Sequence, residues 1–360
     1  VEYEKPDPNL QTELFAKFPR DFGDPLRDLF GPLMEPEVRF ALLSMQPDFP
    51  IHVPKCYFAD YDPATLSGLL ITERIPYGKG NIEPHQDKCL DFELKDPLER
   101  YMAMSKALAR LAGHDQAGKF GPDIKSKFPF NADEIDAGNR IPYTPEQLQG
   151  KLDKLLSFAE SAPQLFEEQV RDKAFLARFT AEAPLLLKHE LAIRSFINKD
   201  PRYIALCHWN GNIDNAWFWR NPDGALEVGL LDWGSVGQLN VAQSVYGMTC
   251  AAETKFLAAH EDDLIRAFLA EYERSGGPRL DRAEFQQHYN LCVALAGIAW
   301  ILDAPTLVEQ EIPDAVTLTG RHDPKLRNNF LARAQLQLLM VLLDIWRRND
   351  IGASLRRFEA

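Results

Sequence analysis

The stretch CHWNGNIDNAWFWRNPDGALEVGLLDWGSVGQLN, residues 207–240, decides how this chain of 360 residues folds. Its aromatic-rich segment 216–220 and its apolar segment 226–231 are both typical of β-strands. The sequence Asn-Pro-Asp-Gly at 221–224, between the two segments, is a strong turn signal. The stretch therefore predicts a β-hairpin.

Two oxygen-bearing side chains converge at the open end of this hairpin. Asn215 comes just before the first strand and Asp232 just after the second, so the hairpin places them close together. An amide oxygen and a carboxylate are hard ligands suited to Mg²⁺, which takes its other ligands from water and substrate phosphates. We therefore expect a magnesium site here. The alternative is a polar-tipped hairpin in which Asp232 is a simple cap.

The spacing of these polar residues resembles the catalytic segment of protein kinases and aminoglycoside phosphotransferases. That segment reads H-x-D-x-x-x-x-N, followed by a hairpin and D-x-G. Here it runs HWN at 208–210, then Asn215, then DWG at 232–234. The resemblance implies that His208 is the structural histidine of the catalytic loop, and that Asn215 and Asp232 bind the metal.

Position 210 departs from the family, which carries its catalytic aspartate there, because it is asparagine. The amide of Asn210 can accept a hydrogen bond from a substrate hydroxyl, but it cannot take the proton. Since phosphoryl transfer depends largely on positioning and charge neutralisation, we expect slow chemistry with nucleotide binding retained. Asp214 is a less favoured substitute base. Its neighbour Asn215 is assigned to the metal, so we expect Asp214 to point elsewhere.

The first 80 residues predict short strands and one helix. Lys17 lies on a strand expected over Thr12–Phe18, which resembles the strand whose lysine holds the α- and β-phosphates. Its expected partner is Glu37, which shares an apolar helix face with Phe40 and needs a cation there. Glu35 is the second candidate. Without such a partner, Lys17 is only an exposed strand lysine.

Two further parts of a nucleotide site, a hinge strand and a glycine-rich hairpin, are expected in the same region. The run Leu69–Arg74 resembles the hinge strand, and backbone groups from Glu73 to Ile75 would then hydrogen-bond adenine; the alternative is an ordinary core strand. The glycine-rich hairpin expected before Lys17 is missing, because Val1–Lys5 supplies only its second strand. Either that loop belongs to an N-terminal segment not included in this sequence, or the protein lacks it.

From Asp96 onward the pattern is helical, with an expected helix end near Gly113. Residues 1–75 therefore form a small β-rich nucleotide-binding lobe, and residues 76–360 form a larger helical lobe that contains the segment 207–234. This order resembles the α+β, bilobed protein-kinase-like fold. Further helices are expected over Pro97–Leu111, Thr144–Ser161, Pro163–Asn198 and Val241–Ala360.

Within that fold, the chain most resembles the aminoglycoside phosphotransferase and choline kinase superfamily. The ecdysteroid-kinase-like proteins are the most similar subgroup, on the runs Val53–Tyr61 and Leu108–Gly113. The resemblance covers roughly residues 1–260. It implies that ATP and Mg²⁺ bind, and it leaves the identity of the substrate open.

Composition limits the partners. The formal net charge of -13 argues against a general nucleic-acid binder, and the absence of a Lys/Arg run disfavours an anionic membrane surface. Five scattered cysteines without a CxxC pair indicate reduced thiols in a cytoplasmic protein. The most apolar stretches, Leu291–Leu302 and Leu336–Trp346, are too short to span a bilayer.

The leading functional hypothesis is an ATP-dependent phosphotransferase acting on a hydroxyl of a small molecule. Lys17 would bind phosphates, and Asn210 would orient the acceptor. The alternative is a catalytically impaired pseudokinase that serves as a nucleotide- or protein-binding module. The acidic segments Glu160–Glu168 and Glu309–Asp314 are candidates for attracting a cationic substrate. A solvated face is their more ordinary interpretation, and the oligomeric state stays open.

Overall fold

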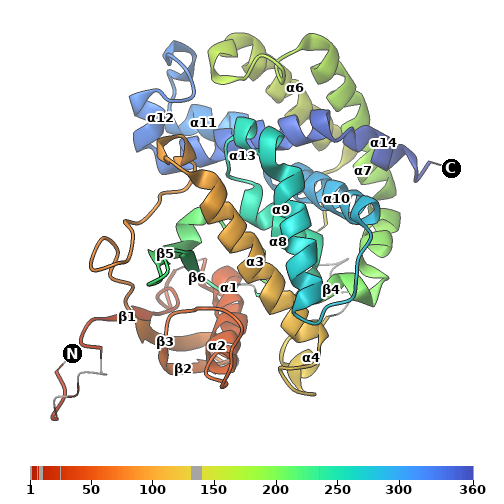
Figure 1. Cartoon of the computed structure of the whole chain (residues 1–360). Helices are drawn as coiled ribbons and strands as arrows, with labels where there is room; N and C mark the ends of the chain where they lie inside the picture. Colours follow the sequence, from red (N-terminus) through yellow and green to blue (C-terminus); the bar gives the residue numbers. More distant parts are fainter. Residues whose placement is uncertain are drawn as a thin grey trace.

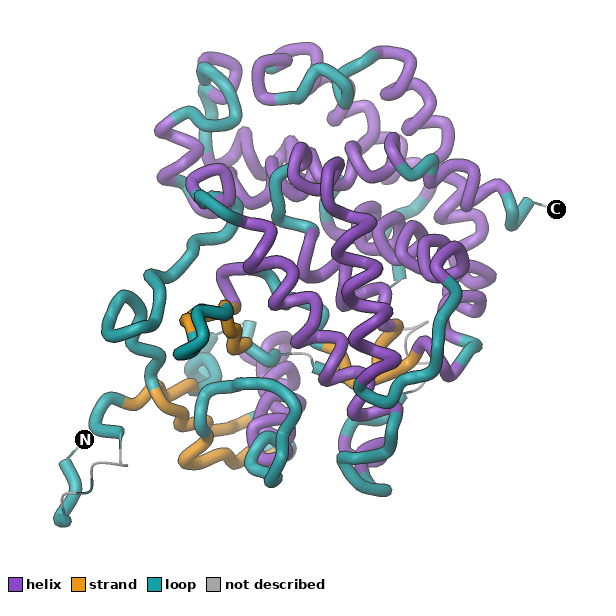
Figure 2. Tube along the Cα trace, in the orientation of Figure 1, coloured by secondary structure: helices purple, strands orange, loops and turns teal. Residues whose placement is uncertain are grey.

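The protein has a small β-rich lobe and a larger helical lobe (Figure 1). In Figure 2 the strands of the small lobe lie at the lower left, and helices fill most of the rest. The order confirms the α+β, bilobed kinase-like fold predicted from the sequence. The lobe boundary at 75/76 stays a prediction. The computed structural model describes residues 2–5, 7, 11–24, 26–130, 140–234 and 236–359.

A three-stranded antiparallel sheet of order β1-β3-β2 forms the small lobe. Helix α2 packs on it through a small core that includes Val38, Cys56 and Leu70. The predicted N-terminal strand is wrong for residues 2–5, which have no strand, and Val1 lies outside the described residues. The elements are β1 (Leu14–Lys17), α1 (Arg27–Phe30), α2 (Met34–Leu43), β2 (Cys56–Asp62) and β3 (Ser67–Glu73).

The large lobe is built from helices of very different length. Their bounds are α3 (Pro97–Gln116), α4 (Ile124–Lys127), α6 (Pro145–Ser161), α7 (Lys173–Asn198), α8 (Val241–Thr249), α9 (Thr254–Arg274), α10 (Arg282–Trp300), α11 (Ala304–Glu311), α12 (Pro324–Asn328), α13 (Phe330–Arg348) and α14 (Ile351–Arg356). Short 3-10 turns cover Gly31–Leu33, Asp91–Glu93, Pro163–Leu165, Pro201–Tyr203, Ile213–Asn215 and Ala315–Thr317. The predicted start of a helix at Pro163 is therefore too early, because α7 begins only at Lys173, where the side chain of Asp172 caps it.

Helix α3 is longer than its sequence predicts, because it does not end near Gly113 but continues to Gln116. It lies beside α9 (Figure 1), and Gly113 faces that neighbour. A Cβ atom at Gly113 would lie 2.7 Å from the carbonyl oxygen of Tyr272 and 2.7 Å from the Cβ of Ser275. The glycine is thus a close-approach position between two helices, and not a stop signal.

The predicted hairpin is present, as β5 (Ala216–Arg220) and β6 (Leu226–Leu230) pair antiparallel in one register. The sequence interpretation missed a second, separate pair of strands, β4 (Ile204–Cys207) with β7 (Gly237–Asn240). Asp115 of α3 holds this pair, because its Oδ2 accepts hydrogen bonds from both strands. The segment 207–234 is therefore anchored at both ends.

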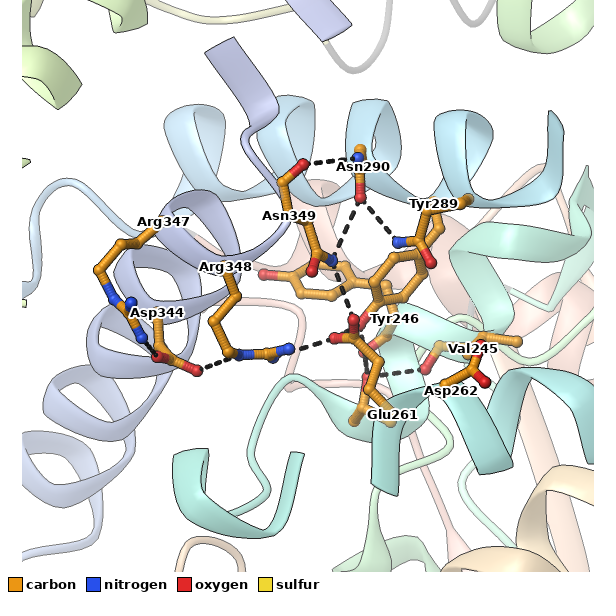
Figure 3. Close-up of polar contacts among 12 residues, drawn as sticks. Val245, Tyr246, Glu261, Asp262, Tyr289, Asn290, Asp344, Arg347, Arg348 and Asn349 are labelled. Carbon is orange, nitrogen blue, oxygen red and sulfur yellow. Dashed lines mark hydrogen bonds and ion pairs between the residues drawn. The ribbon is translucent and has the colours of Figure 1, made fainter. Parts of the chain in front are cut away.

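A buried polar cluster joins α9, α10 and α13 inside the large lobe (Figure 3). The carboxylate of Glu261 accepts hydrogen bonds from Tyr289 at 3.2 Å, Arg348 at 3.2 Å and Asn349 at 2.9 Å. Arg348 also donates to Asp344 at 2.7 Å. Because each buried charge has a partner, the cluster is compatible with a closed core. None of these residues lines the cavity between the lobes.

Among the helices of the described residues, none taken singly has both the length and the apolar character needed to cross a membrane. The adjoining pair α10 and α11 meets that test only jointly, across a 45° bend.

Candidate functional site

A cavity of about 680 Å³ lies where the two lobes meet. The small lobe contributes Lys17 of β1, Glu37 of α2 and the end of β3 to its wall. The large lobe contributes Asn215 and Asp232 from the two ends of the hairpin. The residues predicted to bind nucleotide and metal thus border one cavity, although they come from four separate parts of the sequence.

Lys17 connects the two lobes across this cavity. Its Nζ lies 2.7 Å from Oε2 of Glu37 and 2.8 Å from Oδ1 of Asp232. The predicted Lys17–Glu37 pair is therefore confirmed. Glu35, the second candidate, pairs instead with Arg39 on its own helix. Burial acts to lower the pKa of Lys17, but Glu37 and Asp232 outweigh it, so this pKa lies above its ordinary value and the ammonium stays charged.

Glu37 is a buried acid on the apolar face of α2. Burial raises its pKa above the ordinary value, although the charge of Lys17 and the backbone N–H of Trp233 both act to lower it. A buried carboxylate without a cation is costly, so Lys17 is the partner that lets Glu37 remain on this face. The pair therefore fixes the position of the Lys17 ammonium in the cavity.

His208 is fully buried and connects the loop 208–215 to the end of β6. Its Nε2 lies 3.0 Å from the carbonyl oxygen of Leu231, and its Nδ1 accepts from the N–H of Asn210 at 3.4 Å. Burial lowers the pKa of His208 to about 4, so the ring is neutral at pH 7. A neutral ring with Nε2 as donor satisfies both contacts, which is a structural arrangement rather than one suited to proton transfer.

The amide group of Asn215 is oriented through its nitrogen, and no hydrogen bond to its Oδ1 is found among the described residues. Its Nδ2 donates to the carbonyl oxygen of Asn210 at 2.9 Å, and its own carbonyl oxygen accepts from the N–H of Leu231 at 2.9 Å. Asn215 and Asp232 border the same cavity, so the predicted convergence at the hairpin end is confirmed. Asp232 has φ +61°, a left-handed conformation that is uncommon for an aspartate and marks a constrained backbone.

These two side chains suit a metal that relies on other ligands as well. Within the described residues, no group of three or more His, Cys, Asp or Glu side chains is placed to hold a metal by itself. Mg²⁺ characteristically uses one or two protein ligands and completes its octahedron with phosphate oxygens and water. The donor set of one amide and one carboxylate therefore fits Mg²⁺ bound together with a phosphate chain.

The sequence predicts that Asn210 faces the acceptor, but the structure does not place this residue among those that line the cavity. Its Oδ1 accepts a hydrogen bond from Nδ2 of Asn212 at 2.5 Å and lies 3.5 Å from Nζ of Lys88. The side chain is thus turned toward the segment that connects the lobes, where Lys88 meets it.

The prediction that Asp214 points elsewhere is wrong, because this residue lines the cavity. Its Oδ2 lies 3.8 Å from Nζ of Lys88. Its Oδ1 is buried and has no hydrogen-bond partner among the described residues. Burial raises the pKa of Asp214 despite the opposing charge of Lys88. Neither the position of Lys88 nor its contacts followed from the sequence.

The segment predicted as a hinge also lines the cavity, through Glu73, Ile75 and their neighbours. The side chain of Glu73 is turned away, because its Oε1 accepts from the N–H of Lys55 at 2.9 Å. The carbonyl of Ile75 accepts from the N–H of Tyr77 at 3.0 Å, whereas no partner of the Ile75 N–H is found in the part of the chain that is described. Their backbone role toward adenine stays a prediction.

Trp233 is a site residue that the sequence interpretation did not single out. Its ring stacks on Phe40 of α2 at 3.9 Å and lies 4.4 Å from His208. It therefore connects the helix that carries Glu37 to the loop 208–215. The other aromatic residues of the hairpin pack against each other, with Trp217 and Trp219 at 6.1 Å, as expected for core residues.

The acidic segments proposed for a cationic substrate do not border the cavity. Three of their acidic side chains form ion pairs within the large lobe. Glu167 pairs with Arg321, Glu309 with Lys154, and Asp314 with Lys325. The interpretation as a structural or solvated face is the better one.

No family model matches the chain, and no curated protein matches its sequence. Solved structures similar to it include a choline/ethanolamine kinase family protein from Mesorhizobium loti, with 15% identity and a TM-score of 0.46 over 96% of this chain and 87% of that one. An ethanolamine kinase of Plasmodium vivax shares 12% identity, with a TM-score of 0.47 over 93% and 77% of the two chains. A microcompartment-associated aminopropanol kinase shares 13% identity, with a TM-score of 0.45 over 93% and 86%.

The resemblance to the aminoglycoside phosphotransferase and choline kinase superfamily rests on the sequence motifs of this chain. The more specific likeness to ecdysteroid-kinase-like proteins stays a prediction. Because all three TM-scores lie below 0.5, function has to rest on the side chains of this chain.

Proposed function

We propose that the protein is a phosphotransferase that binds MgATP in the cavity between its lobes and transfers the γ-phosphoryl group to a hydroxyl of a small molecule. The observation that carries this proposal is the position of Lys17, whose ammonium lies 2.7 Å from Glu37 and 2.8 Å from Asp232 at the cavity wall. A charged lysine fixed between two acids is suited to hold a polyanionic phosphate chain.

The remaining parts of the site support a nucleotide in one orientation. Asn215 and Asp232 would hold Mg²⁺, which when bound neutralises charge on the phosphates. The segment from Glu73 to Ile75, which also lines the cavity, would present backbone groups to adenine. Phe40, Ala41 and Leu70 add apolar surface to the same cavity, as a flat base requires.

The alternative, a pseudokinase that binds nucleotide without transferring phosphate, rests on Asn210. Its Oδ1 contacts Asn212 and Lys88, and the residue does not line the cavity. The two candidates share the nucleotide site and differ in turnover. Consumption of ATP therefore separates them, whereas binding does not.

The proposal is tested by measuring ADP release from MgATP with a panel of small hydroxylated compounds, including amino alcohols and sugars. We expect one class of compound to raise ADP release, and Lys17→Met to abolish the increase. Lys255→Met is the matched control, because Lys255 is exposed on α9 and does not line the cavity. If Lys17→Met and Lys255→Met release ADP equally, the assignment of the site is wrong.

A further inference from the structure

A second cavity, of about 240 Å³, lies where α9 meets the loop that leads to α10 (Figure 1). None of its lining residues borders the cavity between the lobes. This local excess of arginine stands out in a chain whose formal net charge is -13. Three arginines, one acid and three apolar residues line the cavity: Arg266, Arg279, Arg282, Glu273, Leu269, Ala270 and Leu280.

Arg266 and Arg282 share a single carboxylate. Nε of Arg266 donates to Oδ2 of Asp262 at 2.6 Å. Arg282 donates to Oδ1 of Asp262 from Nη2 at 2.7 Å and from Nε at 3.0 Å. Because these bonds use only some of the five N–H donors of each guanidinium, other donors remain for a ligand. Asp262 therefore orients both side chains but balances only one of their two charges.

Arg279 adds a third positive charge to the same wall. It is exposed, and its side chain has no hydrogen-bond or ion-pair partner in the part of the chain that is described. The same holds for the side chain of Glu273, so these two residues do not neutralise each other. With Asp262 and Glu273 as the acids, the three arginines leave one positive charge in excess at this cavity.

The loop that carries Arg279 is held on both sides of this residue. The N–H of Gly277 donates to the carbonyl oxygen of Tyr272 at 2.9 Å, and a Cβ atom at Gly277 would lie 2.7 Å from the Tyr272 ring. On the other side, Leu280 is buried. A ligand that binds Arg279 therefore meets a backbone that is already ordered, which lowers the entropic cost of binding.

We propose that this cavity binds a small phosphate monoester that carries a hydroxyl group. The planar fork of a guanidinium matches the geometry of phosphate oxygens, and three of them suit a doubly charged group. Leu269, Ala270 and Leu280 offer apolar surface to the carbon atoms of the ester, and Glu273 would accept a hydrogen bond from its hydroxyl. The proposal does not depend on the proposed phosphotransferase function.

The size of the cavity limits the ligand to a few carbon atoms. Its volume of about 240 Å³ lies below the roughly 300–1,000 Å³ of pockets for drug-sized molecules. The net charge of -13 disfavours an anionic membrane surface as the source of the phosphate. A small, freely diffusing phosphate ester therefore fits these features best.

The test titrates glycerol phosphate into the full chain and measures its affinity by isothermal titration. We expect saturable binding that Arg279→Gln weakens roughly tenfold or more, because hydrogen bonds between charged groups are lost. Arg274→Gln is the matched control, since Arg274 lies on α9 but pairs with Glu271 and does not line the cavity. It should keep the wild-type affinity, and so should Lys17→Met. Thermal unfolding followed by circular dichroism checks that each variant is folded.

Three results would overturn the proposed phosphate site. They are no saturable binding up to about 10 mM, equal affinities of Arg279→Gln and Arg274→Gln, and loss of binding in Lys17→Met, which would place the ligand between the lobes.

The role of Glu273 is tested with two esters. Glu273→Ala should weaken the binding of glycerol phosphate and tighten that of ethyl phosphate, which has no hydroxyl group. Tighter binding of both esters would show that Glu273 only repels the phosphate, and would contradict the hydroxyl contact.

Discussion

Lys17 and Asp232, 215 positions apart in the sequence, lie with Nζ and Oδ1 at 2.8 Å across the cavity between the lobes. Lys17 belongs to an edge strand of the small sheet, and Asp232 follows the hairpin of the large lobe. A lysine that reaches one acid on its own lobe and one on the other has its charge fixed where a phosphate chain would pass. The position of the Lys17 ammonium in the site is set by this contact and by its second contact, with Glu37.

The first prediction concerns Glu37. Glu37→Gln removes the charge that holds Lys17 but keeps the shape of the side chain. We expect ATP affinity to fall roughly 10- to 100-fold, because hydrogen bonds to charged groups contribute about 1.5–3 kcal/mol and each 1.4 kcal/mol is about tenfold in affinity. Glu35→Gln is the matched control, since Glu35 pairs with Arg39 and not with Lys17. Equal affinities of the two variants, measured by isothermal titration, would show that Glu37 does not position the lysine.

The second prediction concerns the contact between α3 and α9. Gly113→Ala places a Cβ atom 2.7 Å from the carbonyl oxygen of Tyr272, so the helices must separate. We expect a loss of about 1–3 kcal/mol in the free energy of unfolding, as for other overpacked sites. Gly150→Ala in α6 has open space around the added atom and should stabilise the protein by about 0.5–1 kcal/mol. Urea unfolding measures both, and a stabilised Gly113→Ala would refute the close-approach role of this glycine.

The third prediction is a pH dependence of stability that originates at Asp91. Burial raises the pKa of Asp91 to about 7, although Tyr101, which donates to its Oδ2 at 2.5 Å, acts to lower it; Glu253 and Asp214 raise it further. The folded pKa exceeds the unfolded value of 3.8, so the folded state binds more protons between these two values. The contribution of Asp91 to stability is therefore favourable at low pH and is lost as pH rises toward 7.

Asp91→Asn removes this dependence, because an amide does not titrate. We expect the free energy of unfolding of the variant, relative to that of the wild type, to increase as pH rises from 5 to 8. Since one pKa unit corresponds to about 1.4 kcal/mol, the increase is up to a few kcal/mol. The measurement is the difference in free energy of unfolding at the two pH values, with Asp223→Asn as control. If the difference between Asp91→Asn and the wild type is the same at pH 5 and pH 8, Asp91 does not have the raised pKa.

Local sequence patterns were sufficient for the parts of the site that lie on regular elements. The turn residues 221–224 defined the hairpin, and with it the convergence of Asn215 and Asp232. The apolar face of α2 identified Glu37 as a buried acid that needs a cation, and Lys17 is that cation. In each case one short segment contained the physical reason for the position.

The parts that the sequence did not predict depend on long-range packing. Lys88 lies on an irregular segment between β3 and α3, and such a segment has no periodicity from which the direction of a side chain can be inferred. Its contact with Asp214 joins this irregular segment to the loop 208–215, which lies far away in the sequence. The motif spacing predicted that Asn210 faces the acceptor, because it contains no information about the contact between Asn210 and Lys88.

The pairing of β7 with β4 and the length of α3 were missed for a similar reason. β7 is only four residues long, and its partner lies more than 30 positions earlier, which no local pattern records. Gly113 is a stop signal by composition, yet it lies inside α3 because α9 requires a residue without a side chain there. Tertiary contacts override local propensity at both places.

The most direct test of the central claim is the effect of Mg²⁺ on ATP affinity in the wild type and in Asp232→Asn, measured by isothermal titration with MgCl₂ or with EDTA. Because Asn215 and Asp232 provide too few ligands to hold the ion without phosphates, ATP and Mg²⁺ should bind together. The account predicts that Mg²⁺ tightens ATP binding roughly tenfold or more in the wild type and hardly at all in Asp232→Asn. No ATP binding, or binding with the same Mg²⁺ dependence in both proteins, would contradict it.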